Sequence, residues 1–212
     1  MRTALFLALF SLAASGCKDP GADVTPATVE APVENEAVAA TGTVEDSPAA
    51  TVLVIGPSNS KIEFVGAKVT KSHDGGFTDF AGKVEVGEPI ESSQIDITIQ
   101  TASLYADEEK LTKHLKSPDF FDVEKFPTAT FRSTGIDKEG DGHMITGDLT
   151  LHGVTKRVTF PATIQITDGA VNANAEFSIN RQDFGITYPG MPDDLIRDLV
   201  VIKLALDLPR QG

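Results

Sequence analysis

The sequence has very little cysteine and a shortage of positive charge. Its single cysteine, Cys17, lies near the N-terminus of a 212-residue chain, so the rest of the protein can form neither a disulfide nor a cysteine-based metal or redox centre. The 18 lysines and arginines are outnumbered by 31 aspartates and glutamates, which gives a net charge of -13. Nucleic-acid binding needs a basic surface that displaces counterions from phosphates. This charge balance therefore argues against nucleic acid as a partner.

Long apolar runs and catalytic motifs are missing as well. No run reaches the length of about 18 apolar residues that a membrane-spanning helix needs. The chain has no GxSxG elbow, no HExxH motif, no P-loop and no cysteine nucleophile after its N-terminal region. Its four histidines lack the close spacing of a zinc motif; they are His73, His114, His143 and His152. We expect no catalytic residue, no metal site and no cofactor, and a binding protein rather than an enzyme.

The first residues have the layout of an export signal. Arg2 precedes an apolar run that extends from Ala4 to Ala14, and small residues then lead to Cys17. The segment ASGC resembles the bacterial lipobox, whose cysteine becomes the lipidated N-terminus, with Ala14 in the place of the usual leucine. The alternative is ordinary signal cleavage beside an incidental cysteine. We expect residues 1–17 to be a lipoprotein-type signal peptide, Cys17 to be lipidated, and the exported protein to face the periplasm or to be an outer-membrane lipoprotein.

Residues 18–51 have the composition of a disordered chain. They are rich in alanine, proline, valine, threonine and acidic residues, they contain no aromatic residue, and Lys18 is their only basic residue. Such a segment cannot bury enough apolar surface to offset the conformational entropy that it would lose on folding. We interpret it as an acidic tether that is dispensable for folding.

Period-two alternation dominates residues 52–209, which we interpret as the folded domain. Ile95, Ile97 and Ile99, for example, alternate with polar residues, as expected for a half-buried strand. The expected strands are 61–69, 77–86, 95–100, 126–134, 143–151, 154–166, 171–179 and 200–208. About eight antiparallel strands with one polar and one apolar face predict a closed barrel or a sandwich.

One helix is expected to interrupt the strands, over residues 107–116. Asp107 can cap its N-terminus, acidic residues suit its first turn, and Lys113 and Lys116 suit its last turn. Leu111 and Leu115 form a single narrow apolar stripe. We expect this helix to plug or cover one end of a barrel.

One face of the 171–179 strand contains small residues where a packed core would have large ones. Ala173 and Ala175 lie between Val171, Phe177 and Ile179, so they either leave an open lumen or accommodate a bulky neighbour. The same parity continues to Arg181 and Asp183. A charge on this face must be paired or lie at an open mouth. The two residues therefore form a rim that meets a polar head group, or else an internal pair or a lock on the turn before Phe184 and Gly185.

The chain resembles the YceI-like family of exported polyisoprenoid- and lipid-binding proteins from about residue 52 to residue 208. The resemblance rests on four motifs in order, which are GGFTDFAG (75–82), HLKSPDFFDVEKFPTATF (114–131), TGDLTLHGVTKRVTFPA (146–162) and INRQDFGITYPGMPDDLIRD (179–198). It implies an all-β fold: an extended, eight-stranded antiparallel, lipocalin-like barrel with one short helix. It also implies that a long amphiphilic lipid occupies an apolar lumen.

We therefore expect non-catalytic binding of a long-chain lipid of the polyisoprenoid class in the cell envelope, with a role in carriage, storage or stress protection. The expected ligand-binding residues are Val171, Ala173, Ala175, Phe177, Ile179, Arg181 and Asp183. The membrane is the second expected partner, through the lipid anchor. Two other functions remain open, which are a surface interaction protein with a filled barrel and a hydrolase with a site at the barrel mouth.

Overall fold

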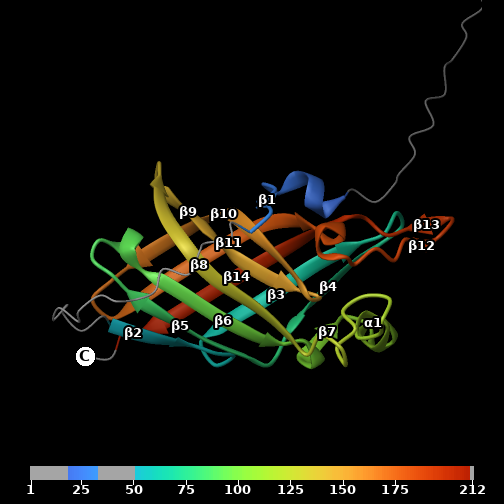
Figure 1. Ribbon diagram of the computed structural model, residues 1–212, viewed down its shortest axis with the longest axis horizontal. Helices are drawn as coiled ribbons and strands as arrows, with labels where there is room; N and C mark the ends of the chain where they lie inside the picture. Colours follow the sequence, from blue (N-terminus) through green and yellow to red (C-terminus); the bar gives the residue numbers. More distant parts are fainter. Residues whose placement is uncertain (1–18, 33–50, 211–212) are drawn as a thin grey trace, which may run out of the picture.

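The computed structural model describes residues 19–32 and 51–210 of the chain, and nearly all of its regular structure is β-strand (Figure 1). The strands are β1 (Thr28–Glu30), β2 (Thr51–Ile55), β3 (Ser60–Ala67), β4 (Ser72–Phe77), β5 (Phe80–Val86), β6 (Gln94–Gln100), β7 (Leu104–Ala106), β8 (Thr128–Glu139), β9 (Gly142–Leu151), β10 (Val154–Ile166), β11 (Ala170–Asn180), β12 (Gly190–Met191), β13 (Asp194–Leu195) and β14 (Leu199–Pro209). The helices are α1 (Glu109–Leu115) and four short 3₁₀ helices, at Pro20–Asp23, Ile90–Ser92, Thr101–Ser103 and Arg181–Phe184. No helix within these two described ranges is long and apolar enough to cross a membrane.

The sheet is antiparallel and curls on itself. Its strand order is β2-β5-β6-β8-β9-β10-β11-β14-β3-β4-β7, with β1 added beside β10. A short turn links the strands next to the two ends of this path, because β4 ends at Phe77 and β5 begins at Phe80. The sheet contains twelve strands rather than the eight expected, since β1, β2, β4 and β7 are added to the eight predicted ones. The predicted class, an antiparallel all-β barrel with one short helix, is confirmed.

Alternation along the strands places the core inside the curled sheet. In β11, Val171, Phe177 and Ile179 are buried, whereas Asn174 and Glu176 are exposed. The buried side chains form two clusters, because the barrel is longer than one side-chain layer. The cluster next to β2 contains Leu53, Ile55, Phe80, Val84 and Leu208. The other contains Val158, Phe160, Phe177, Ile179 and Phe184.

Helix α1 and the β12–β13 hairpin lie at the opposite end of the barrel from β2 (Figure 1). The helix falls within the predicted range, but Asp107 does not cap it as expected. The Oδ1 atom of Asp107 instead lies 2.9 Å from His73 Nδ1, and Glu108 takes the N-cap position without a side-chain capping bond. The contact with His73 of β4 thus engages the carboxylate that could have capped the helix.

The N-terminal segment corrects one prediction. Strands β10 and β11 pair only between Thr163 and Ile166 on one side and Val171 and Asn174 on the other. Beyond this ladder they separate, and residues 25–30 lie between them. The amide of Ala27 donates to the Ser178 carbonyl (2.8 Å) and the amide of Ser178 donates to the Thr25 carbonyl (3.1 Å), which attaches the segment to β11.

On its other side the same segment pairs with β10, in register from Thr28 opposite Thr159 to Glu30 opposite Arg157. The Ala27 and Val29 side chains pack against the cluster of Phe160 and Phe177. The prediction of an unstructured tether is therefore wrong for residues 20–30, because these two apolar side chains and the free edges of two strands compensate for the ordering of the chain. Residues 33–50 and the predicted signal peptide with Cys17 lie outside the described residues.

Candidate functional site

A cavity of about 510 Å³ lies inside the sheet, next to α1. Its volume falls within the range of about 300–1,000 Å³ that is typical of small-molecule sites. Most of its wall is aliphatic or aromatic; the wall includes Phe64, Phe131, Phe160, Phe177, Ile179 and Ile202. The inward face of the long strands supplies these side chains, so the alternation that forms the core also forms the cavity. An apolar enclosed space of this kind suits a hydrocarbon chain.

Aromatic side chains from α1, from the segment after it and from the loop before β12 cover the cavity. The ring centroids of His114, Phe120 and Tyr188 lie 5.0–5.3 Å from one another. Phe121 contacts the Phe77 ring edge-on at 5.9 Å. These rings also line the cavity, together with Leu111 and Leu115 of the helix. The helix therefore covers this end of the barrel, as the apolar stripe predicted.

Charged side chains line the cavity at the same end of the barrel. They are Lys68, Glu108, Lys110, Arg181, Asp194 and Arg197. Asp194 accepts a hydrogen bond from Lys68, and this bond is the main cause that lowers the pKa of Asp194. Glu108 accepts a hydrogen bond from Lys71, which likewise lowers the pKa of Glu108. Both carboxylates are thus ionised and neutralised by a neighbouring lysine.

Arg181 is 5% exposed and is held by protein acceptors. Its Nη1 donates to the Ile186 carbonyl (2.7 Å), its Nε donates to the Arg197 carbonyl (3.1 Å), and its Nη2 lies 3.1 Å from Asp198 Oδ1. Burial is the largest effect on this guanidinium and lowers its pKa, while Asp198 opposes the shift. The side chain both lines the cavity and fixes the turn after β11. Its charged partner is Asp198, not the Asp183 suggested by sequence parity.

The other predicted binding residues divide between the two ends of the barrel. Phe177, Ile179 and Arg181 line the cavity. Val171 belongs to the packed cluster next to β2, Ala173 packs against that cluster, and Ala175 packs against the second cluster. None of these last three lines the cavity, and Asp183 is exposed.

The two alanines do not create the cavity because bulky residues face them across the strand pair. Ala173 is opposite Leu206 in β14, and Ala175 is opposite Leu204. Leu206 is buried in the packed cluster, so it fills the space that Ala173 leaves. Of the two alternatives that the sequence left open, a lumen or a bulky neighbour, the structure shows the bulky neighbour. Contact of any of these residues with a ligand stays a prediction.

Several residues that line the cavity were not predicted from the sequence. Phe120 and Phe121 follow the helix, and Lys110 and Arg197 lie on the helix and before β14, where no period-two pattern marks an inward face. The 114–131 and 179–198 motifs contain three of these four residues. These motifs were therefore the feature of the sequence that could have indicated these lining residues.

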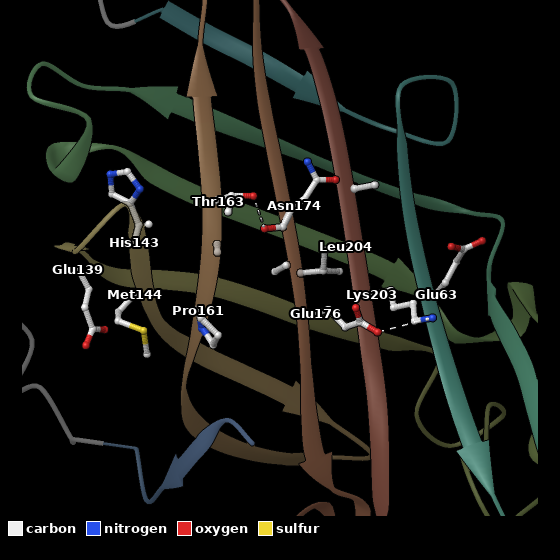
Figure 2. Close-up of a pocket in the computed structure, with 14 residues that line it drawn as sticks. Glu63, Glu139, His143, Met144, Pro161, Thr163, Asn174, Glu176, Lys203 and Leu204 are labelled. Atoms are coloured by element: carbon white, nitrogen blue, oxygen red, sulfur yellow. Dashed lines mark hydrogen bonds and ion pairs between the residues drawn. The ribbon is translucent and has the colours of Figure 1, made fainter. Parts of the chain in front are cut away.

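A second hollow, of about 630 Å³, lies across β3, β8, β9, β10, β11 and β14 (Figure 2). Outward-facing polar side chains line much of it, with Lys203 between Glu63 and Glu176 and its Nζ 3.7 Å from Glu176 Oε1. His143 also lines it; this side chain is 9% exposed, and neither ring nitrogen has a hydrogen-bond partner among the described residues. Within residues 19–32 and 51–210, no three His, Cys, Asp or Glu side chains are grouped as a metal site. The hollow has no apolar enclosure comparable to that of the cavity.

Comparisons with known proteins agree with this architecture. The family model described as "YceI-like domain" matches residues 53–208. A UPF0312 protein of Pseudomonas putida is 43% identical over 125 residues, which cover 55% of this chain and 65% of that protein. The chain thus matches slightly less than two thirds of the length of this relative.

Two solved structures share the fold. The crystal structure of Burkholderia cenocepacia BcnA superposes with a TM-score of 0.65 and 26% identity, over 70% of this chain and 95% of that chain. A polyisoprenoid-binding domain from Saccharophagus degradans superposes with a TM-score of 0.61, over 76% of this chain and 99% of that chain. Because its identity is 14%, the second likeness concerns the fold alone.

Proposed function

Because the chain belongs to the family of YceI-like domains, we propose that it binds a long-chain amphiphilic lipid of the polyisoprenoid class in the cavity next to α1. The family and the fold support a binding protein rather than an enzyme. The observation that carries the proposal is the cavity itself, an apolar space of about 510 Å³ whose charged groups are confined to one end. Such a space accommodates a hydrocarbon tail and leaves the polar head among the charged side chains.

The polyisoprenoid class is supported by one structural neighbour, the polyisoprenoid-binding domain from Saccharophagus degradans. The proposed location is the cell envelope, with Cys17 as the lipid-modified anchor. The order of the chain supports this location, since an apolar run and small residues precede Cys17. Holding a lipid in a barrel next to a membrane is compatible with carriage, storage or protection from stress.

The two alternative functions receive less support. A surface interaction protein needs a filled barrel, whereas this barrel has an apolar cavity at one end. A hydrolase needs a nucleophile and a base within hydrogen-bond reach of each other. Among the charged groups of the cavity, Lys68, Glu108, Arg181 and Asp194 are engaged in ion pairs.

A pair of matched variants tests the proposal. Ala129 lines the cavity and is 3% exposed, whereas Ala81 is exposed on the outer face of β5. Delipidated wild type and Ala81→Phe should each take up about one long-chain polyprenol per chain. Ala129→Phe should take up markedly less, because the new ring and the tail compete for one volume, while overpacking lowers the free energy of unfolding by about 1–3 kcal/mol.

Uptake is measured on protein separated from free polyprenol, and circular dichroism establishes that each variant is folded. Equal uptake by the folded Ala129→Phe variant would place the lipid outside the cavity. No uptake by the wild type would remove the proposed function.

A further inference from the structure

We infer that the cavity selects lipids with an anionic head group, a phosphate or a carboxylate, and that Lys110 and Arg197 bind this group. The inference rests on the proposed function, since it assigns the head of the lipid whose tail the cavity holds. It follows from the charges at the α1 end of the barrel, once each ion pair has been taken into account.

Most charges that line the cavity are neutralised within the protein. Lys68 pairs with Asp194, and Lys71 pairs with Glu108. Arg181 pairs with Asp198 at 3.1 Å and also donates to backbone carbonyls. Neither of the two acids that line the cavity is therefore left to repel an anion.

The two lining histidines also have carboxylate partners. His73 Nδ1 lies 2.9 Å from Asp107 Oδ1, and His114 Nε2 lies 2.9 Å from Asp119 Oδ2. The histidines are thus oriented by their own partners and are not needed to bind the head group.

Two cations remain. Lys110 lines the cavity from α1, and no carboxylate in residues 19–32 or 51–210 lies within ion-pair distance of its ammonium group. Arg197 lines the cavity from the segment before β14, and its Nε is buried without a hydrogen-bond partner in that same part of the chain. The nearest carboxylate oxygen, Oδ2 of Asp19, is 3.9 Å from this nitrogen, which exceeds hydrogen-bond distance.

An unsatisfied buried N–H of a guanidinium is unfavourable and is rare in folded proteins. The Arg197 side chain as a whole is 38% exposed and donates no hydrogen bond to a described residue, so the outer nitrogens of its fork can bind a phosphate or carboxylate oxygen with charge-assisted hydrogen bonds. Lys110 adds a second, mobile positive charge on an exposed side chain. Although the chain has a net charge of -13, two cations line this apolar cavity without a hydrogen-bonded carboxylate partner among the described residues. The combination matches an amphiphile with a long apolar tail and an anionic head.

Ligand pairs that share one tail test the inference. A polyprenyl phosphate and the polyprenol with the same tail are titrated into delipidated full-length protein, and a long-chain fatty acid and its alcohol form a second pair. We expect at least one anion to bind about tenfold more tightly than its alcohol. This preference should shrink as salt shortens the Debye length from about 30 Å at 0.01 M to about 8 Å at 0.15 M.

Glutamine variants assign the preference to residues. Lys110→Gln and Arg197→Gln should each lose most of the preference but keep the affinity for the alcohol, which shows that the cavity remains folded. Lys113→Gln is the matched control, because Lys113 lies on the same helix, is 74% exposed, pairs with Glu109 at 2.7 Å and does not line the cavity. The control should keep the preference.

The outcomes separate the two proposals. A preference in the phosphate pair alone assigns a phosphate head, and a preference in both pairs assigns anionic heads in general. Equal affinity for anion and alcohol in both pairs would overturn the inference and leave lipid binding intact, as would a preference that survives in both glutamine variants. Failure of all four ligands to bind would overturn the proposed function itself.

Discussion

Val29 is the residue whose replacement tests whether the N-terminal segment is part of the barrel wall. It lies opposite Val158 of β10, and its side chain is half-buried against the cluster of Phe160 and Phe177. Val29→Asp should weaken this packing, and Thr28→Asp is the matched control because the Thr28 side chain is exposed on the same strand. The two variants carry the same new charge one residue apart.

The size of the effect follows from the burial of Val29. Full burial of a valine side chain stabilises a protein by about 1.5–3 kcal/mol, so a half-buried valine contributes about 1 kcal/mol. A carboxylate facing apolar side chains adds a penalty of about 1–3 kcal/mol. The total loss has a ceiling, which is the free energy that holds residues 25–30 in place, because the segment can detach. We expect Val29→Asp to lower the free energy of unfolding by about 2 kcal/mol, or the Tm by about 4–8 °C.

Urea denaturation measures the loss, and hydrogen exchange locates it. The Ser178 amide donates to the Thr25 carbonyl, and Ser178 is fully buried. Its exchange should accelerate in Val29→Asp and should stay slow in Thr28→Asp. The reasoning would be refuted if both variants had the stability of the wild type within about 0.5 kcal/mol, the usual range for surface substitutions.

Three further predictions rest on the structure and one, at Cys17, rests on the sequence. Ala173→Leu should lower the free energy of unfolding by about 1–3 kcal/mol in urea titrations without reducing lipid uptake, because it overfills the packed end. Arg181→Leu should lower it by about 3–5 kcal/mol in the same titration, since it leaves buried carbonyls unpaired. Cys17→Ser should move the protein from the membrane to the soluble fraction, as fractionation would show. Because a hydrogen bond from Lys68 lowers the pKa of Asp194, this ion pair should hold at neutral pH and be lost as pH falls through that pKa, with the carboxyl titrating below 3.8 by NMR.

Eight of the twelve strands of the main sheet could be predicted from the sequence because their inward faces are apolar and their outward faces are polar. The expected strand at 154–166 coincides with β10 (Val154–Ile166), and the expected strand at 171–179 lies within β11 (Ala170–Asn180). Helix α1 could also be located, because Pro118 and the Leu111–Leu115 stripe delimit it. These features depend only on local sequence, since each is encoded within a single element.

The N-terminal strand and the position of the cavity could not be predicted. Residues 25–30 are ordered by the free edges of β10 and β11, which are far away in the sequence. The position of the cavity within the barrel depends on which side chains meet across strand pairs. Leu206 fills the space beside Ala173, whereas no such partner fills the space below α1. Arg181 could be identified as an inward charge, but its partner Asp198 lies on another segment, so counting by two pointed to Asp183 instead.

The central claim is that the cavity next to α1 holds a long-chain lipid, and the most direct measurement is mass spectrometry of an organic extract of the protein purified from the cells that produce it. We predict about one long-chain lipid per protein chain, released on unfolding and markedly reduced in an equal extract of Ala129→Phe. An extract without a stoichiometric lipid, from a wild-type protein that also takes up no polyprenol after delipidation, would contradict the account.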